Sequence, residues 1–229
     1  MRALPFLLSY LVPLSVLATA GTSGLVPGVP VLLVFVAIPL LDRWIGESRS
    51  NPAPNEEAEL KESLPHRLVL WFYVPLHLAV LAYAAAQLRG ISIESALIVL
   101  SVGVSSGAVG ITVAHELIHR PGRFERGLGV IILASVLYGH FRIEHVVGHH
   151  AKVATPRDPA TARRGQSVYR FWVQSVAGGL ADAWTIESRR RKRLGRSVVS
   201  PANRLLRYAG VSGVLGGLLG LAFGPATAH

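Results

Sequence analysis

The feature that most constrains this chain is a series of long apolar runs separated by polar segments. The runs cover residues 3–20, 25–41, 68–88, 91–114 and 205–223. About 20 apolar residues in a helix, rising roughly 1.5 Å per residue, cross the hydrocarbon core of a bilayer. No alternating pattern of the kind that indicates strands is found. The sequence therefore predicts an all-α fold, a polytopic bundle of transmembrane helices in a single membrane domain over residues 1–229.

The composition agrees with a membrane protein. Of the 229 residues, 51% are hydrophobic and 16% are charged, a balance outside that of ordinary soluble domains. The first run also permits a second interpretation, because Ala18-Thr19-Ala20 resembles a signal-peptide cleavage site. The topology of the other spans is the same under both interpretations.

Positive charge is confined to one part of the chain. From His115 to Arg207 there are 17 Lys and Arg against 6 Asp and Glu, a net charge of +11, whereas the whole chain carries +10. Basic segments between spans stay on the cytoplasmic side of the membrane. We therefore expect residues 115–204 to face the cytoplasm, in a multi-pass protein of the cell (inner) membrane.

A dense basic run lies within this segment. Residues 189–193 read Arg-Arg-Arg-Lys-Arg, and Arg196 follows. In a soluble protein such a run would indicate nucleic-acid binding, but beside a span it favours contact with anionic membrane lipid. Docking of an acidic electron donor is the alternative. We expect no nucleic-acid partner.

The fourth apolar run leads directly into a pair of histidines in His115-Glu116-Leu117-Ile118-His119, and Pro121-Gly122 follows. Proline and glycine end helices, so the helix should end near His119 or Arg120. At a spacing of four, the two imidazoles are separated by about 40° around a helix and can reach one metal ion. The absence of cysteine restricts any metal to nitrogen and oxygen ligands.

A second histidine cluster follows in Glu144-His145-Val146-Val147-Gly148-His149-His150. If this segment is α-helical, His145 and His149 share a face, and His150 points about 100° away from His149. The cluster can then serve two metal ions. The intervening apolar segment, residues 127–141, is too short to span, so both clusters should lie at the same mouth of the membrane.

The other histidines fit neither motif. His77 lies at membrane depth, and we interpret it as hydrogen-bonded between helices, with a functional role as the alternative. His140 is interpreted as a packing group or as a group behind the metal ligands. His66 and His229 are expected in solvent. The small residues of segment 101–110 indicate close helix packing, with a narrow substrate channel as the alternative.

The two motifs HELIHR and EHVVGHH, followed by AKVATPRDPATARRGQSVYRFW, resemble the membrane-bound alkane monooxygenases, within the wider group of fatty-acid-desaturase-like proteins. The likeness is strongest over about residues 110–190. It implies a non-haem di-iron site with two Fe ions, where O2 hydroxylates the terminal carbon of an alkane. Electrons would come from a rubredoxin-type donor. The resemblance implies that the iron ligands are His115, His119, His145, His149 and His150.

The chain departs from this family in its C-terminal part. The family also has an E-H-Y motif and a third box of the form H-x-x-H-H, and neither occurs here. Five histidines leave two irons under-ligated, so the isolated chain is expected not to hydroxylate an alkane.

Other functions stay open at this stage. One is a fatty acid desaturase or hydroxylase-like enzyme. Another is a membrane zinc metalloprotease with Glu116 as general base, against which the second histidine cluster argues. The last is a non-catalytic membrane protein or fragment descended from such an oxygenase.

Overall fold

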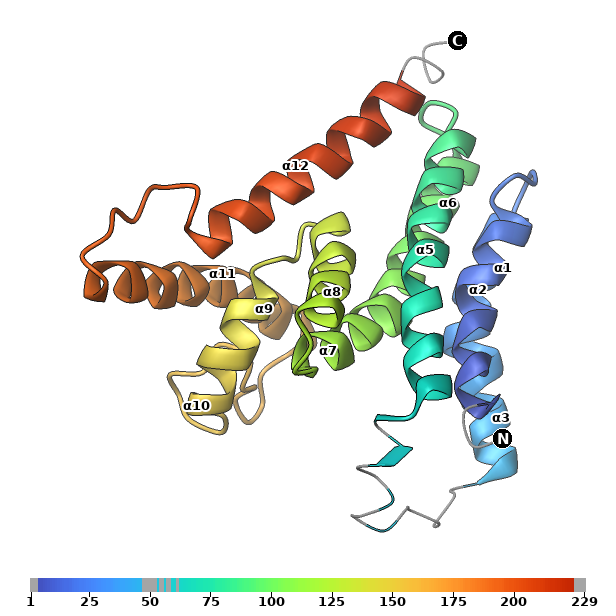
Figure 1. Cartoon of the computed structure of the whole chain (residues 1–229). Coiled ribbons are helices and arrows are strands. Elements are labelled where there is room, and N and C mark those ends of the chain that lie inside the picture. The colour runs from blue at the N-terminus through green and yellow to red at the C-terminus, as the bar shows by residue number, and fades with distance from the viewer. Residues whose placement is uncertain (1–3, 47–52, 54–55, 57–58, 61, 225–229) are drawn as a thin grey trace. The chain divides into compact units, whose positions relative to one another are not determined.

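A computed structural model describes residues 4–46, 53, 56, 59–60 and 62–224. These residues form helices joined by turns, and no strand occurs among them (Figure 1). The predicted all-α fold is confirmed. His229, which is predicted to be exposed to solvent, lies outside the described residues.

The chain divides into two compact units. The first comprises residues 1–117 and 217–229, and the second comprises residues 118–216. The boundary falls inside one continuous helix, α7 (Ile111–His119). The single membrane domain inferred from the sequence stays a prediction.

The first unit is built from helices that are interrupted by tighter or wider turns. Its elements in chain order are η1 (Leu4–Tyr10), α1 (Leu11–Thr19), η2 (Val26–Gly28), α2 (Val29–Leu32), η3 (Leu33–Ala37), α3 (Ile38–Ile45), α5 (Leu64–Gln87), α6 (Ile93–Ser105), η4 (Ser106–Gly110) and α7. Prolines begin several of them, at positions where the missing N–H group has no partner within the helix.

Four helical stretches are long and apolar enough to cross a membrane. They are Val26–Ile45, Leu64–Gln87, Ile93–His119 and Arg204–Ala222. Each overlaps one of the five predicted spans. The remaining run forms a shorter apolar helix, Leu4–Thr19, among the residues described. The third stretch continues beyond the apolar run 91–114, because α6, η4 and α7 form one helix that ends at His119, as the sequence predicts.

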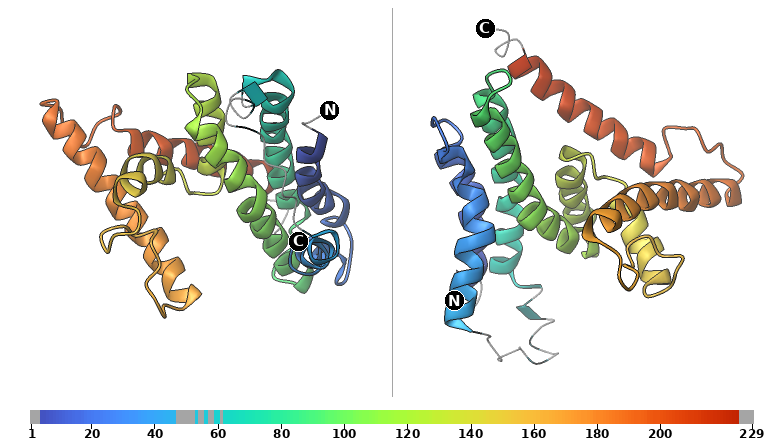
Figure 2. Two further views of the ribbon diagram at one scale, coloured as in Figure 1. Left: turned by 90° about the horizontal axis from the view of Figure 1, so that it is seen from below. Right: turned by 180° about the vertical axis from the view of Figure 1, so that it is seen from behind.

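Helices α1, α5 and α6 lie side by side in the first unit (Figures 1 and 2). Small and branched side chains fill the space between them: Val16, Ala20, Val80, Ala84 and Ile98. The predicted close packing of segment 101–110 is confirmed at two positions. Ser101 Oγ donates a hydrogen bond to Pro27 O at 2.6 Å, and Gly110 packs against the ring of His77.

The second unit contains short helices followed by two long ones. After the end of α7 come α8 (Arg123–Ser135), α9 (Phe141–Ile143), η5 (Glu144–His149), α10 (His150–Lys152), α11 (Val168–Arg193) and α12 (Arg204–Phe223), the last of which continues into the first unit. Helix α8 has 13 residues and is not long enough to be a span, as predicted for this apolar segment. Its side chains Ile132 and Leu133 are buried.

Helix α11 is the support of the second unit, with η5 and α9 packed along it (Figure 1). Gly148 of η5 permits this close contact, because a Cβ atom there would force the side chains of Asp182 and Ile186 to move. Ile143, Ala183 and Leu205 form a small buried cluster. The packing fixes the histidine-bearing η5 segment against a rigid helix.

Candidate metal centre

Helix α7 ends where the sequence predicts. His119 is its last residue, and Pro121 and Gly122 follow in a turn. His115 lies one turn earlier on the same helix, so both imidazoles point to the same side. The end of an apolar, span-length helix thus presents two ring nitrogens at its terminus.

The second histidine cluster is not α-helical. Residues Glu144–His149 form a π-helix, a rare wider turn that is frequent at functional sites. The wider turn changes the angular spacing that an α-helix would impose. As a result, Nε2 of His150 lies 3.2 Å from Nε2 of His145, although α-helical geometry would turn His150 away from its neighbour His149.

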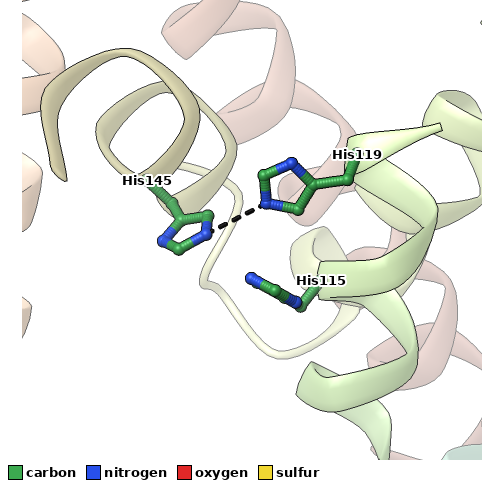
Figure 3. A group of neighbouring side chains, drawn as sticks. All are labelled: His115, His119 and His145. Carbon is green, nitrogen blue, oxygen red and sulfur yellow. Dashed lines mark hydrogen bonds between the residues drawn. The ribbon is translucent and has the colours of Figure 1, made fainter. Parts of the chain in front are cut away.

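Three histidines gather their ring nitrogens into one small volume. Nε2 of His145 lies 3.1 Å from Nε2 of His119. One ligand nitrogen from each of His115, His119 and His145 lies within 4.8 Å of the other two. Figure 3 shows the rings of His115 and His119 projecting from the end of α7 toward His145. Nε2 of His150 lies beside Nε2 of His145, so a fourth ring nitrogen is adjacent to the three histidines.

These distances fit a metal ion. Two imidazole nitrogens bound at about 2.0–2.1 Å from one metal, with a right angle between them, would lie roughly 3 Å apart. A buried acceptor next to the histidines also lacks a partner: among the described residues, none donates a hydrogen bond to Oε1 of Glu144. A bound cation or its coordinated water is the kind of group that satisfies such an oxygen. The residues present therefore fit a histidine-ligated metal.

His149 is held by a buried carboxylate. Its Nδ1 lies 2.8 Å from Oδ2 of Asp158, and the Asp158 side chain is fully buried. Thr161 Oγ1 donates to the same oxygen, and the backbone N–H of Ala160 donates to Oδ1 at 3.0 Å. Burial acts to raise the pKa of Asp158, but these hydrogen bonds outweigh it and lower the pKa. An ionised Asp158 fixes the proton of His149 on Nδ1 and leaves Nε2 as the ligand atom.

Other charges of the second unit surround this pair. Burial and the negative charge of Asp158 raise the pKa of Glu144. Lys152 forms an ion pair with Asp182 of α11. His140 is buried beside Glu144, since both approach Gly179 of α11. The interpretation of His140 as a packing group or as a group behind the metal ligands stays a prediction.

The predicted ligands fall into two sets. His115, His119 and His145 share one volume, with His150 adjoining, whereas His149 stacks on His145 with 5.2 Å between ring centroids and is bonded to Asp158. Their assignment as five iron ligands stays a prediction.

Two other histidines lie outside this group. His77 is buried in the first unit, and His66 is half-buried, with Nδ1 2.6 Å from Ser63 Oγ, although it was expected in solvent. Ser63 immediately precedes helix α5, and its hydroxyl holds the ring of His66 in the first turn of the helix.

Sequence reasoning missed Asp158. Its signal was present, because it is one of only six acidic residues in the basic segment 115–207 and follows His149 closely. An isolated acid among so many cations indicates a specific role for its charge.

Comparisons with known proteins establish the family of this chain. The family model described as fatty acid desaturase matches residues 91–229, and the chain belongs to that family. Within it, the chain is 37% identical to the alkane 1-monooxygenase of Ectopseudomonas oleovorans over 205 residues, 88% of this chain and 51% of the relative. It is also 37% identical to alkane 1-monooxygenase 1 of Alcanivorax borkumensis, over 86% of this chain and 50% of that protein.

A more distant relative is the hydroxylase component of a xylene/toluene monooxygenase from Pseudomonas putida, 33% identical over 56% of this chain and 35% of the relative. The resemblance inferred from the histidine motifs is confirmed. The chain spans about half the length of the alkane 1-monooxygenases it matches.

Proposed function

We propose that this chain is an integral-membrane monooxygenase of the alkane 1-monooxygenase type, with two non-haem irons held by His115, His119, His145, His149 and His150. The substrate would be the terminal carbon of an alkane, and a rubredoxin-type protein would supply electrons. One atom of O2 enters the C–H bond, and the other leaves as water after uptake of two electrons and two protons.

The observation that carries the proposal is the convergence of the first and second histidine clusters. Nε2 of His119 at the end of α7 and Nε2 of His145 in η5 come within 3.1 Å across 26 residues of sequence. Bound iron supplies the oxidising chemistry that an inert C–H bond requires, and imidazole is a suitable ligand for it. A metal at the end of a span-length helix is also near a hydrocarbon substrate dissolved in the bilayer.

The residues of the chain have distinct roles in this proposal. The histidines hold the metal through ring nitrogens, and Asp158 keeps the proton of His149 away from its ligand atom. Helix α11 keeps η5 in place through the close contact at Gly148. The basic charge of residues 115–204 supports a cytoplasmic location, where a soluble electron donor has access.

The proposal is tested by following terminal alcohol formation from medium-length alkanes in membranes that contain the chain. Since the chain spans about half the length of its relatives, it is assayed by itself and together with the second half of a curated relative. A rubredoxin system supplies the electrons in both assays. We expect alcohol only in the combined assay, because five histidines leave part of each iron's coordination sphere unfilled.

The matched control is the same combined assay with His145→Ala, which should form no alcohol. Two outcomes would contradict the account. If the combined assay fails although both parts are folded and bind iron, the proposed reaction is wrong. If the chain by itself forms alcohol and His115→Ala abolishes it, the ligand set is larger than the five histidines named here.

A further inference from the structure

Helix α11 carries an exposed apolar stripe. At 100° per residue, six of its side chains fall within an arc of about 120°. They are Tyr169, Trp172, Val173, Val176, Leu180 and Trp184, and we call them the α11 stripe. All six are exposed, with Tyr169 at 72% and Val173 at 70%. Three of the six are aromatic rings of the amphipathic kind that gathers at membrane–water interfaces.

The other side of the helix is already occupied. Nε2 of Gln174 donates hydrogen bonds to Pro159 O at 3.0 Å and to Thr161 O at 3.2 Å. Gly178 lies against the ring of Pro159. The loop that carries Asp158 therefore packs behind the first half of α11. The six side chains of the α11 stripe stay exposed, although Ala183 within the same arc is buried.

The charge around the α11 stripe has one sign. Between Pro159 and Arg196 the only acids are Asp182 and Glu187, and both are paired, with Lys152 and with Arg190 and Arg204. Exposed basic side chains lie before and along the helix: Arg163, Arg164, Arg170, Arg189, Lys192, Arg193 and Arg196. An apolar stripe with aromatic rings, flanked by basic residues on the polar side, is typical of helices that lie in a membrane interface.

We propose that α11 lies in the membrane interface, with the α11 stripe inserted at the boundary of headgroups and acyl chains and the basic residues on anionic lipid headgroups. The bilayer is the partner indicated by the chain itself, since four of its helices are long and apolar enough to cross one. Charge complementarity selects anionic over zwitterionic lipid. This proposal is independent of metal binding, but it places the helix that supports η5 on the lipid surface.

The chain is suited to a spin-label test because it contains no cysteine. Val173→Cys and Val176→Cys place a nitroxide on the α11 stripe. Ala181→Cys is the matched control, an exposed position on the same helix about 120° from the centre of the stripe. The full chain is reconstituted in nanodiscs of phosphatidylcholine, with or without phosphatidylglycerol. Collision of each label with O2, which enters the bilayer, and with a water-soluble nickel chelate is then measured.

We expect the labels at 173 and 176 to collide with O2 and to be protected from the nickel chelate, while the label at 181 collides with the chelate. If all three labels collide equally with the chelate, the stripe is in water and the proposal is wrong. Protection of 173 and 176 from both reagents would show a protein contact, a second copy of the chain included, and would also overturn it.

A second comparison tests whether the α11 stripe requires anionic lipid. Removing phosphatidylglycerol should increase collision of the 173 label with the nickel chelate. The triple variant Arg163→Gln, Arg164→Gln, Arg170→Gln should show a smaller lipid dependence at the same label. Equal protection in both lipid compositions would overturn the assignment of anionic headgroups as the ligands of these arginines.

Discussion

At the scale of single residues, the structure pairs two buried acids, Asp158 and Glu187, with specific donors. Asp158 accepts hydrogen bonds from His149, Thr161 and the backbone of Ala160. Buried carboxylates are rarely found unless they are paired in this way. Asp158 and Glu187 each give a testable prediction.

The first prediction concerns Asp158→Asn. An amide can no longer favour the His149 tautomer with Nδ1 protonated, so the Nε2 lone pair is not reserved for the metal. Loss of a carboxylate behind a histidine ligand typically costs about 10–100-fold in metal affinity. Equilibrium dialysis of the purified chain against Fe(II), with Asp42→Asn at an exposed position as control, measures the effect. Unchanged affinity would show that Asp158 does not act through the metal ligands.

The second prediction concerns Glu187, a fully buried acid of α11. Its oxygens accept from Arg190 Nε at 3.0 Å and from the backbone N–H of Arg204 at 3.0 Å, with Arg204 Nε donating as well. Glu187→Gln should lower the free energy of unfolding by about 1–3 kcal/mol, because it removes the charge from hydrogen bonds to the partly exposed guanidinium groups of Arg190 and Arg204. Thermal unfolding in detergent, compared with the exposed Glu62→Gln, measures the loss.

The stability that Glu187 contributes also depends on pH. Burial acts to raise its pKa, yet the hydrogen bonds from Arg190 and Arg204 outweigh burial and lower the pKa from 4.5 to about 2. A lowered folded-state pKa means that the stabilisation is complete above pH 4.5 and is lost as the pH falls toward 2. Glu187→Gln should lack this acid-dependent component. If the free energy of unfolding falls equally in both proteins as the pH is lowered from 4.5 toward 2, the assignment is wrong.

At the scale of elements, the positions of the histidines depend on how closely η5 and the loop that contains Pro159 pack against α11. Gly178 and Gly179 are neighbours on this helix with different surroundings. A Cβ atom at Gly178 would lie 2.7 Å from Cβ of Pro159, whereas one at Gly179 would lie 3.5 Å from Cγ of Glu144, an ordinary contact. The helix therefore accepts a methyl group at one position and not at the next.

The third prediction uses this pair. Gly178→Ala should push Pro159 away, destabilise the chain by about 1–3 kcal/mol through overpacking, and weaken metal binding, since Pro159 adjoins Asp158. Gly179→Ala is the matched control and should be neutral or stabilising, because alanine favours a helix over glycine by about 1 kcal/mol. The melting temperature and Fe(II) affinity of the two variants are compared. Equal melting temperatures and equal Fe(II) affinities in the two variants would show that the contact with Pro159 does not hold the loop in place.

Much of the element-scale structure was predictable from the sequence, because apolar length and helix-ending residues act locally. The helix that carries His115 and His119 ends where Pro121 and Gly122 require it to end. The π-helix at Glu144–His149 was not predictable, because its wider turn follows from packing against α11, far away in the sequence. For the same reason the approach of His150 to His145 could not be read from α-helical spacing.

At the scale of the whole molecule, helices and charge together predict a membrane topology. In the part of the chain that the structure describes, four helical stretches are long and apolar enough to cross a bilayer, and the excess of positive charge lies between the third and the last of them. The positive charge predicts the cytoplasmic side for residues 115–204, and both histidine clusters belong to that segment. The sequence predicts that the two histidine clusters meet only because both lie on this side of the membrane. The hydrogen-bond partners of Asp158 and Glu187 could be identified only from the folded chain.

The fourth prediction tests that topology. Gly165 lies in an exposed turn with φ +76, where an insertion disturbs no helix. A reporter fused there that is active only outside the cytoplasm should give no signal, while a reporter active only in the cytoplasm should give full signal. The reverse pattern would place the histidine clusters on the outer side of the membrane.

The metal content of the purified chain tests the central claim most directly. We expect iron, quantified per chain by elemental analysis, to be retained and to fall in His119→Ala and His149→Ala, since loss of a nitrogen ligand weakens binding. His66→Ala, outside both clusters, should keep the iron of the unaltered chain. Stoichiometric zinc that persists in His149→Ala would contradict the account and would favour a zinc site of the protease type.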